Sequence, residues 1–194
     1  MSNGPEDASS PLPPDALAAN SWFMNALRTT VYWGITRWLT WRFHFHVEGA
    51  EVFRHTPQFI LISNHSSHID AVCLLAALPA RLRNRCFSAA ASDYFYTNPV
   101  RKWAARLFAN TFPFTRHTNP QGGLDACARI LARGDSLIFF PEGTRSVPGE
   151  LQPFKKGIGT LAQGSPYHVI HAYLHGDHQV LGKGRFALRT AHLR

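Results

Sequence analysis

Short apolar segments alternate with longer segments of helical periodicity along most of this chain. Six segments have the length and composition of strands: 43–47, 59–62, 86–90, 110–116, 136–140 and 168–174. Helices are predicted between them, at 71–78, 99–109 and 119–133. This alternation favours an α/β fold, in which one layered sheet of mixed, partly parallel strands is flanked by helices. In such sheets, binding sites gather at the carboxyl ends of the strands.

A histidine and an aspartate follow one of these predicted strands. Residues 64–70 read Asn-His-Ser-Ser-His-Ile-Asp and lead directly into the helix at 71–78. Positions five apart on a regular helix are separated by about 140°, so His65 and Asp70 can face each other only if His65 lies in the preceding turn. Asp70 can then bind one ring nitrogen while the other takes a proton. A histidine base without an enzyme nucleophile suits a reaction in which a substrate hydroxyl attacks.

Two simpler interpretations of the same segment remain open. Ser67 and Asp70 have the spacing of a helix N-cap followed by an acidic residue at the third helical position, which needs no catalysis. His65, His68 and Asp70 are also possible metal ligands. No second cluster of cysteine or histidine with ligand spacing accompanies them, so we predict no metal.

A second candidate segment, residues 140–146, follows the apolar segment at 136–140 and reads Phe-Pro-Glu-Gly-Thr-Arg-Ser. Gly143 allows the backbone to approach a ligand, and Arg145 can bind a phosphate through its guanidinium fork. Thr144 can donate a hydroxyl, and Glu142 can orient the neighbouring groups. A charged turn after a buried strand would look the same in isolation.

Other cations near predicted strand ends are less informative. Arg116 ends the predicted strand at 110–116, where a lone arginine is usually solvated. Lys155 and Lys156 begin a further predicted helix, where they would either meet substrate phosphates or line a solvated face.

The chain is basic, with 20 Lys and Arg against 12 Asp and Glu in 194 residues. A formal charge of +8 favours an anionic partner, such as a membrane surface, a phosphorylated substrate or an acidic carrier protein. No recognised nucleic-acid motif is present, so nucleic acid is not expected. Cys73, Cys86 and Cys127 lack metal or redox spacing and are expected as buried thiols in a cytoplasmic setting.

The first 43 residues fall into two parts. Residues 1–20 are rich in Ser, Pro, Asp and Ala and are expected to form a disordered leader without the features of a secretory signal. Residues 21–43 have helical periodicity, with Leu27, Val31 and Leu39 on one broad apolar face and Arg28 on the polar side. The four tryptophans and the arginines favour an amphipathic helix at a membrane interface over one that only packs on the domain.

Segments 64–70 and 140–146, about 70 residues apart, closely resemble the first and third signature blocks of the glycerolipid acyltransferase family. The resemblance implies that His65 is the general base and Asp70 its orienting partner. It implies that Asn64, Arg116 and residues 142–145 (Glu142, Gly143, Thr144 and Arg145) belong to the substrate site. The chain differs from the family at Asn110, where glycine is common, at Pro113, and at His171, where proline is usual.

The resemblance also implies a reaction. The family moves an acyl group from acyl-CoA or acyl carrier protein to 1-acyl-glycerol-3-phosphate, without a cofactor, in phospholipid synthesis. Glycerol-3-phosphate, another lysophospholipid or a lyso-aminolipid are alternative acceptors, and a non-catalytic membrane-binding module is an alternative outside the enzyme class. We expect an acyltransferase domain at 44–194, with its last strand possibly missing. We expect the protein at the cytoplasmic face of a membrane, on anionic lipid, as a peripheral or monotopic protein.

Overall fold

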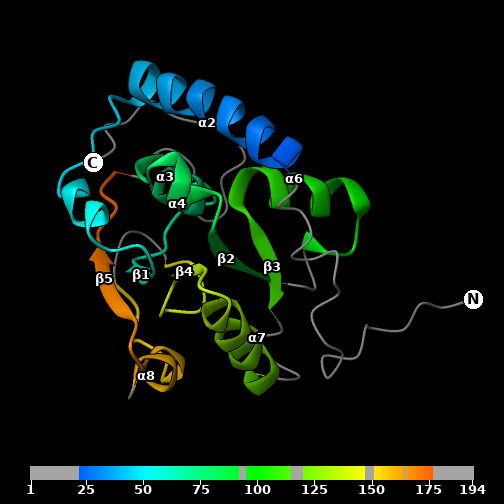
Figure 1. The fold of residues 1–194 in the computed structure, drawn as a ribbon, viewed down its shortest axis with the longest axis vertical. Coiled ribbons are helices and arrows are strands. Elements are labelled where there is room, and N and C mark those ends of the chain that lie inside the picture. Colours follow the sequence, from blue (N-terminus) through cyan, green and yellow to red (C-terminus); the bar gives the residue numbers. More distant parts are fainter. Residues whose placement is uncertain (1–21, 92–94, 115–119, 147–150, 164, 177–194) are drawn as a thin grey trace, which may run out of the picture.

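A computed structural model describes residues 22–91, 95–114, 120–146, 151–163 and 165–176 of the chain. Five strands in these residues form one sheet in the order β3-β2-β4-β1-β5 (Figure 1). Their bounds are Phe59–Ser63 (β1), Cys86–Ala91 (β2), Thr111–Phe114 (β3), Ser136–Phe139 (β4) and His168–Ala172 (β5). All four strand pairings are parallel. The predicted α/β fold is therefore confirmed, and the described part of the sheet is parallel throughout.

Helices cover both faces of this sheet. The helices are Trp22–Phe43 (α2), Asp70–Ala77 (α3), Ala80–Arg83 (α4), Pro99–Ala109 (α6), Pro120–Ala132 (α7) and Gly157–Ala162 (α8), with a 3-10 helix at Ala50–Arg54. Figure 1 shows α3, α4 and α6 on one side of the sheet, with α2 lying across them, and α7 and α8 on the other. The helices thus separate the sheet from solvent on both sides.

Strand β1 contributes to two separate hydrophobic cores. Phe59 and Leu61 pack in the core that also holds side chains of α2 and α3. Ile60 and Ile62 pack in the opposite core, with side chains of α7 and α8. Successive strand residues point to opposite faces, so a strand covered on both sides reads as a continuous apolar run. The 59–62 segment has that pattern because β1 is a central strand.

Helix α2 is held to the domain by polar groups at the C-terminal end of α6. Arg28 is fully buried and donates from Nη2 to the carbonyl oxygen of Arg106 over 3.1 Å. The Tyr32 hydroxyl donates to the carbonyl oxygen of Phe108. The last carbonyls of a helix have no partner within that helix and carry its negative dipole end, so a cation there is favourable. Arg28, expected on the outward polar side, was therefore assigned to the wrong face.

Arg83 ties the same helix to α3. Its Nε and Nη2 donate to the carbonyl oxygens of Leu75 and Leu78, both over 2.8 Å. Its guanidinium carbon lies 4.6 Å from the centroid of the Tyr32 ring. Arg83 therefore caps the C-terminal end of α3 and stacks on α2 at the same time.

The strand expected at 43–47 is not present. Helix α2 continues to Phe43, and His44 then adopts a left-handed conformation with φ of 51°. The N–H of Phe45 donates to the carbonyl of Leu39 over 3.4 Å, and Phe45 is buried in the same core as Phe43. The apolar alternation in this segment reflects side-chain burial at a helix end, and no strand is formed there.

Two departures from the family pattern fit their positions in the fold. Asn110 follows α6 with φ of 44°, a left-handed conformation that asparagine tolerates better than most residues other than glycine. Its side-chain amide also donates to the carbonyl of Cys86 over 2.7 Å. Pro113 lies in β3 at the end of the described sheet, where the missing N–H is least costly. His171 is exposed on β5, the strand at the opposite end.

Some predictions concern residues beyond the described part of the chain. These are the leader at 1–20, the terminal segment after residue 176 and Arg116. Among the described helices, none combines the length and the apolar character that crossing a bilayer would require.

Candidate active site

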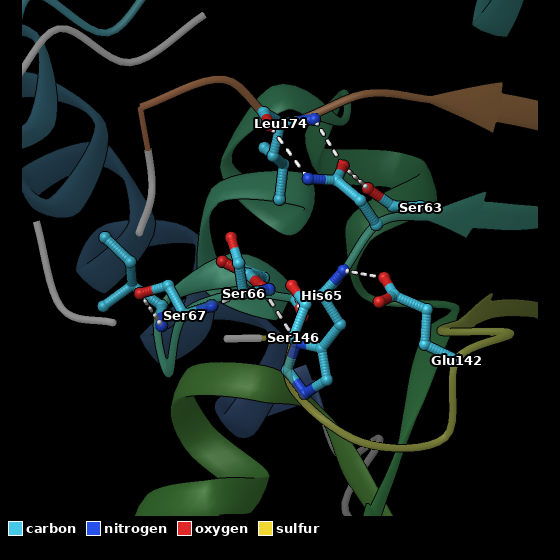
Figure 2. Close-up of polar contacts among 10 residues, drawn as sticks. Ser63, His65, Ser66, Ser67, Glu142, Ser146 and Leu174 are labelled. Atoms are coloured by element: carbon cyan, nitrogen blue, oxygen red, sulfur yellow. Dashed lines mark hydrogen bonds and ion pairs between the residues drawn. The ribbon is translucent and has the colours of Figure 1, made fainter. Parts of the chain in front are cut away.

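His65 and Asp70 are in direct contact where β1 meets α3. His65 Nδ1 lies 2.8 Å from Oδ2 of Asp70, whose side chain is fully buried. The same oxygen accepts the backbone N–H groups of Ser66 and Ser67 over 2.8 and 2.9 Å (Figure 2). Because β1 ends at Ser63 and α3 begins at Asp70, the histidine lies in the turn, as the spacing predicts.

This contact defines which histidine nitrogen is available for proton transfer. A carboxylate accepts hydrogen bonds, so Nδ1 of His65 carries the proton that faces Asp70 and Nε2 is the basic nitrogen. The imidazole also stacks on the ring of Phe140, which follows β4, with 4.1 Å between the centroids and 19° between the planes. A carboxylate and an aromatic face thus fix the orientation of the ring.

The helix-cap interpretation of this turn is met only in part, because Asp70 accepts the N–H of Ser67 as the acidic residue of a capping box does. Helix α3 begins at Asp70 with Ile69 at its N-cap position, and no side chain caps it there. Ser67 is therefore not the N-cap, although its hydroxyl accepts the N–H of Ile69 over 3.3 Å. In the part of the chain that the structure describes, no group of three potential ligands could hold a metal ion.

Glu142 links the turn that holds His65 to the segment that follows β4. Its side chain is buried, with 2% of its surface exposed. Oε1 accepts the backbone N–H of His65 over 2.7 Å, as Figure 2 shows, and Oε2 accepts the N–H of Gln152 over 2.9 Å. Each carboxylate oxygen therefore holds the backbone of a different segment. Sequence analysis did not identify Gln152.

Ser146 holds the other side of the His65 peptide. Its N–H and its hydroxyl both donate to the carbonyl oxygen of His65, over 2.7 and 3.1 Å. Both backbone groups of His65 are thus bound by residues that follow β4. These contacts are possible because β1 and β4 are neighbours, with Ile62 paired to Phe139. Ser146 belongs to the 140–146 segment, but sequence analysis gave it no function.

Asn64 joins the end of β1 to the chain beyond β5. Its Nδ2 donates to the carbonyl of Leu174 over 2.9 Å, and its Oδ1 accepts the N–H of Leu174 over 2.8 Å. The Ser63 hydroxyl lies 3.2 Å from the same oxygen (Figure 2). The side-chain amide of Asn64 therefore pairs with the backbone of Leu174 as a neighbouring strand would. This pairing fixes the residue that directly precedes His65.

The remaining residues of the second segment differ in conformation and exposure. Gly143 has φ of 68°, Thr144 is exposed and Arg145 is partly buried. The pKa of His68 is lowered, first by burial and then by the charges of Arg145 and His65. The charge of Arg145 thus acts on this side of the turn, and a nearby cation favours an anionic ligand.

The chain was compared with known proteins. It is 32% identical over 170 residues to a 1-acyl-sn-glycerol-3-phosphate acyltransferase of Limnanthes alba, covering 80% of this chain and 53% of that protein. It is 30% identical over 128 residues to the chloroplastic 1-acyl-sn-glycerol-3-phosphate acyltransferase BAT2 of Brassica napus, covering 64% of this chain and 35% of that one. The chain thus spans between about a third and about half of the length of these two relatives.

The fold is also similar to a solved structure. The crystal structure of the 1-acyl-sn-glycerophosphate acyltransferase PlsC from Thermotoga maritima superposes with a TM-score of 0.66 at 23% identity, covering 88% of this chain and 64% of that chain. The profile of the family described as Acyltransferase matches residues 44–174, which include every described strand and the whole His65 site. The chain belongs to the acyltransferase family.

Proposed function

We propose that this protein transfers a fatty acyl group from acyl-CoA or acyl carrier protein to the free hydroxyl of 1-acyl-glycerol-3-phosphate. The observation that carries this proposal is the contact between His65 and the fully buried Asp70, at 2.8 Å. It provides an oriented base beside a positively charged edge of the site. The relatives named 1-acyl-sn-glycerol-3-phosphate acyltransferase support the choice of acceptor.

In this reaction, Nε2 of His65 takes the proton of the acceptor hydroxyl as its oxygen attacks the thioester carbonyl. The new ester bond forms and the carbon–sulfur bond breaks. The proton on Nε2 then passes to the departing thiolate, which leaves as a thiol. Asp70 keeps Nδ1 protonated and stabilises the imidazolium while it carries the extra proton. No acyl-enzyme intermediate is required.

The phosphoglycerol part of the acceptor is assigned to the loop after β4. Arg145 would bind the phosphate, and Gly143 and Thr144 would let the backbone and a hydroxyl approach it. The lowered pKa of His68 supports this assignment in part, because the charge of Arg145 contributes to it after the larger effect of burial. Arg116 is proposed as a second phosphate ligand on family resemblance alone.

We propose that α2 lies on the cytoplasmic face of an anionic membrane. Helix α2 exposes five large aromatic side chains: Trp22, Phe23, Trp33, Trp38 and Trp41, exposed by 82, 59, 69, 39 and 77%. The guanidinium of Arg37 lies 5.7 Å from the centroid of the Trp33 ring. Aromatic rings with adjacent cations suit the headgroup region, where lysolipid acceptors and lipid products also reside.

The test is acyl transfer by the purified protein. Labelled acyl-CoA or acyl carrier protein is offered with lysophosphatidate in detergent or vesicles, and the lipid product is identified by chromatography. Formation of labelled phosphatidate supports the proposal. Transfer only to glycerol-3-phosphate, another lysophospholipid or a lyso-aminolipid would replace the acceptor. Vesicle binding without transfer to any acceptor would favour a non-catalytic membrane module.

A further inference from the structure

The segment after Gln152 returns to the loop that follows β4. The backbone N–H of Lys155 donates to the carbonyl oxygen of Pro141 over 2.8 Å. Three residues earlier, the N–H of Gln152 donates to Oε2 of Glu142 over 2.9 Å. Two hydrogen bonds therefore fix this segment to the same turn that holds the backbone of His65 through the other oxygen of Glu142.

The side chain of Lys155 lies over Gly143. A Cβ atom added to Gly143 would lie 3.0 Å from Cδ, Cε and Nζ of Lys155, closer than such atoms normally approach. Gly143 also has φ of 68°, a conformation that favours glycine. The absence of a side chain at position 143 thus lets the ammonium group of Lys155 lie against the loop.

The charges around this lysine favour an anion. Arg145 follows Gly143 by two residues on the same loop, and its charge helps to lower the pKa of His68 after the larger effect of burial. The two buried carboxylates of the site, Asp70 and Glu142, bind the His65 ring and backbone N–H groups. Lys155 and Lys156 are both exposed, and Lys156 occupies the N-cap position of α8.

We propose that Lys155 is a phosphate-binding residue of this site, presenting its ammonium group across Gly143 to the anion that Arg145 also binds. The proposal rests on the proposed function and deepens it, because it identifies which of two adjacent lysines recognises the substrate. A compact ammonium group is well suited to a phosphate, and a neighbouring arginine adds a directional fork. Both the acceptor phosphate and the phosphates of CoA have the required chemistry.

Three variants separate charge from packing. K155M retains most of the stem that packs on Gly143 but removes the charge, K155R retains the charge, and K156M is the matched control. Steady-state kinetics would be measured with lysophosphatidate and acyl-CoA varied in turn. For K155M we expect KM for one substrate to rise by at least about tenfold, as loss of a hydrogen bond to a charged group predicts, with kcat much less affected. K155R should recover most of this loss, and K156M should resemble the wild type.

The substrate whose KM rises identifies the phosphate: lysophosphatidate indicates the acceptor, and acyl-CoA the donor. A K155M variant that matches K156M in both KM values would overturn the proposal, as would a K155R variant that fails to recover binding. If the wild type itself transfers no acyl group, the proposed function fails separately. Lys155 is then tested by titrating lysophosphatidate in neutral detergent micelles and CoA in buffer, where unchanged affinity of K155M for both ligands would refute phosphate binding.

Discussion

The carboxylate of Glu142 accepts the backbone N–H of His65 over 2.7 Å, although the two residues lie 77 positions apart. The other oxygen of Glu142 accepts the N–H of Gln152. Three segments of the chain are therefore joined at one buried carboxylate. His65, the proposed general base, is held through its backbone as well as by Asp70.

Replacing Glu142 by glutamine tests this arrangement. The glutamine amide supplies one acceptor oxygen and one donor NH2 group. The backbone N–H of either His65 or Gln152 would therefore face the NH2 group and lose its acceptor. We expect the free energy of unfolding to fall by about 1 to 3 kcal/mol, the usual cost of a buried unsatisfied polar group, and the rate of acyl transfer to fall as well. Urea denaturation measures the first quantity. E48Q is the control, because the Glu48 side chain is 78% exposed, and equal stability of the two variants would contradict this role.

Asn64 allows a similar isosteric test at the end of β1. In the wild type, the amide of Asn64 donates to the carbonyl of Leu174. An aspartate would place a carboxylate oxygen against that carbonyl oxygen, and the hydrogen bond would be lost. We expect N64D to lose about 1 to 3 kcal/mol of stability at neutral pH. N98D is the matched control, because Asn98 accepts the N–H groups of Val100 and Arg101 as an N-cap and aspartate is equally suited to that position. A stable N64D variant would show that the Leu174 contact is dispensable.

The environment of His68 predicts a pH dependence of stability. Its pKa is lowered from 6.5, first by burial and then by Arg145 and His65, so the unfolded chain binds a proton more readily. The contribution of His68 to the free energy of unfolding is therefore complete at pH values above its pKa in the unfolded chain. It is lost as the pH falls through its pKa in the folded protein. Between about pH 7.5 and pH 5, the wild type should lose more stability than H68Q. Denaturant titrations at several pH values would measure the difference, and parallel curves would be inconsistent with it.

The aromatic side of α2 predicts binding to vesicles. Exchanging Trp33 and Trp41 for glutamine removes exposed rings without disturbing the buried side of the helix. We expect the double variant to bind vesicles containing anionic lipid more weakly in a flotation assay, because less apolar surface enters the interface. V52Q is a control at an exposed apolar position outside α2. Equal flotation of the double variant and the wild type would contradict the proposed orientation.

The helical segments and the His65 turn could be predicted because both depend on local spacing. The period of the apolar residues indicates the helices, and the five-residue separation places His65 before α3. The burial of Arg28 could not be predicted, because its partner is a carbonyl of α6, 78 positions away. Alternation at 43–47 indicated burial correctly but cannot show whether a neighbouring strand is present.

The contacts made by Gln152 and Ser146 were also beyond the reach of sequence patterns. Gln152 contributes only a backbone N–H, which any residue other than proline has. Ser146 binds the carbonyl of His65, so its function depends on the parallel pairing of β1 and β4. Local sequence carries no signal for such pairing.

The most direct test of the catalytic assignment is the rate of acyl transfer to lysophosphatidate by the wild type, by H65A and by H46A. His46 is an exposed histidine beside Glu48, and it serves as the control. The account predicts that H65A keeps the folded state, judged by its unfolding transition, while kcat falls by about 10² to 10⁴-fold and H46A remains unaffected. Transfer by a folded H65A variant within a few-fold of the wild type would contradict His65 as the general base.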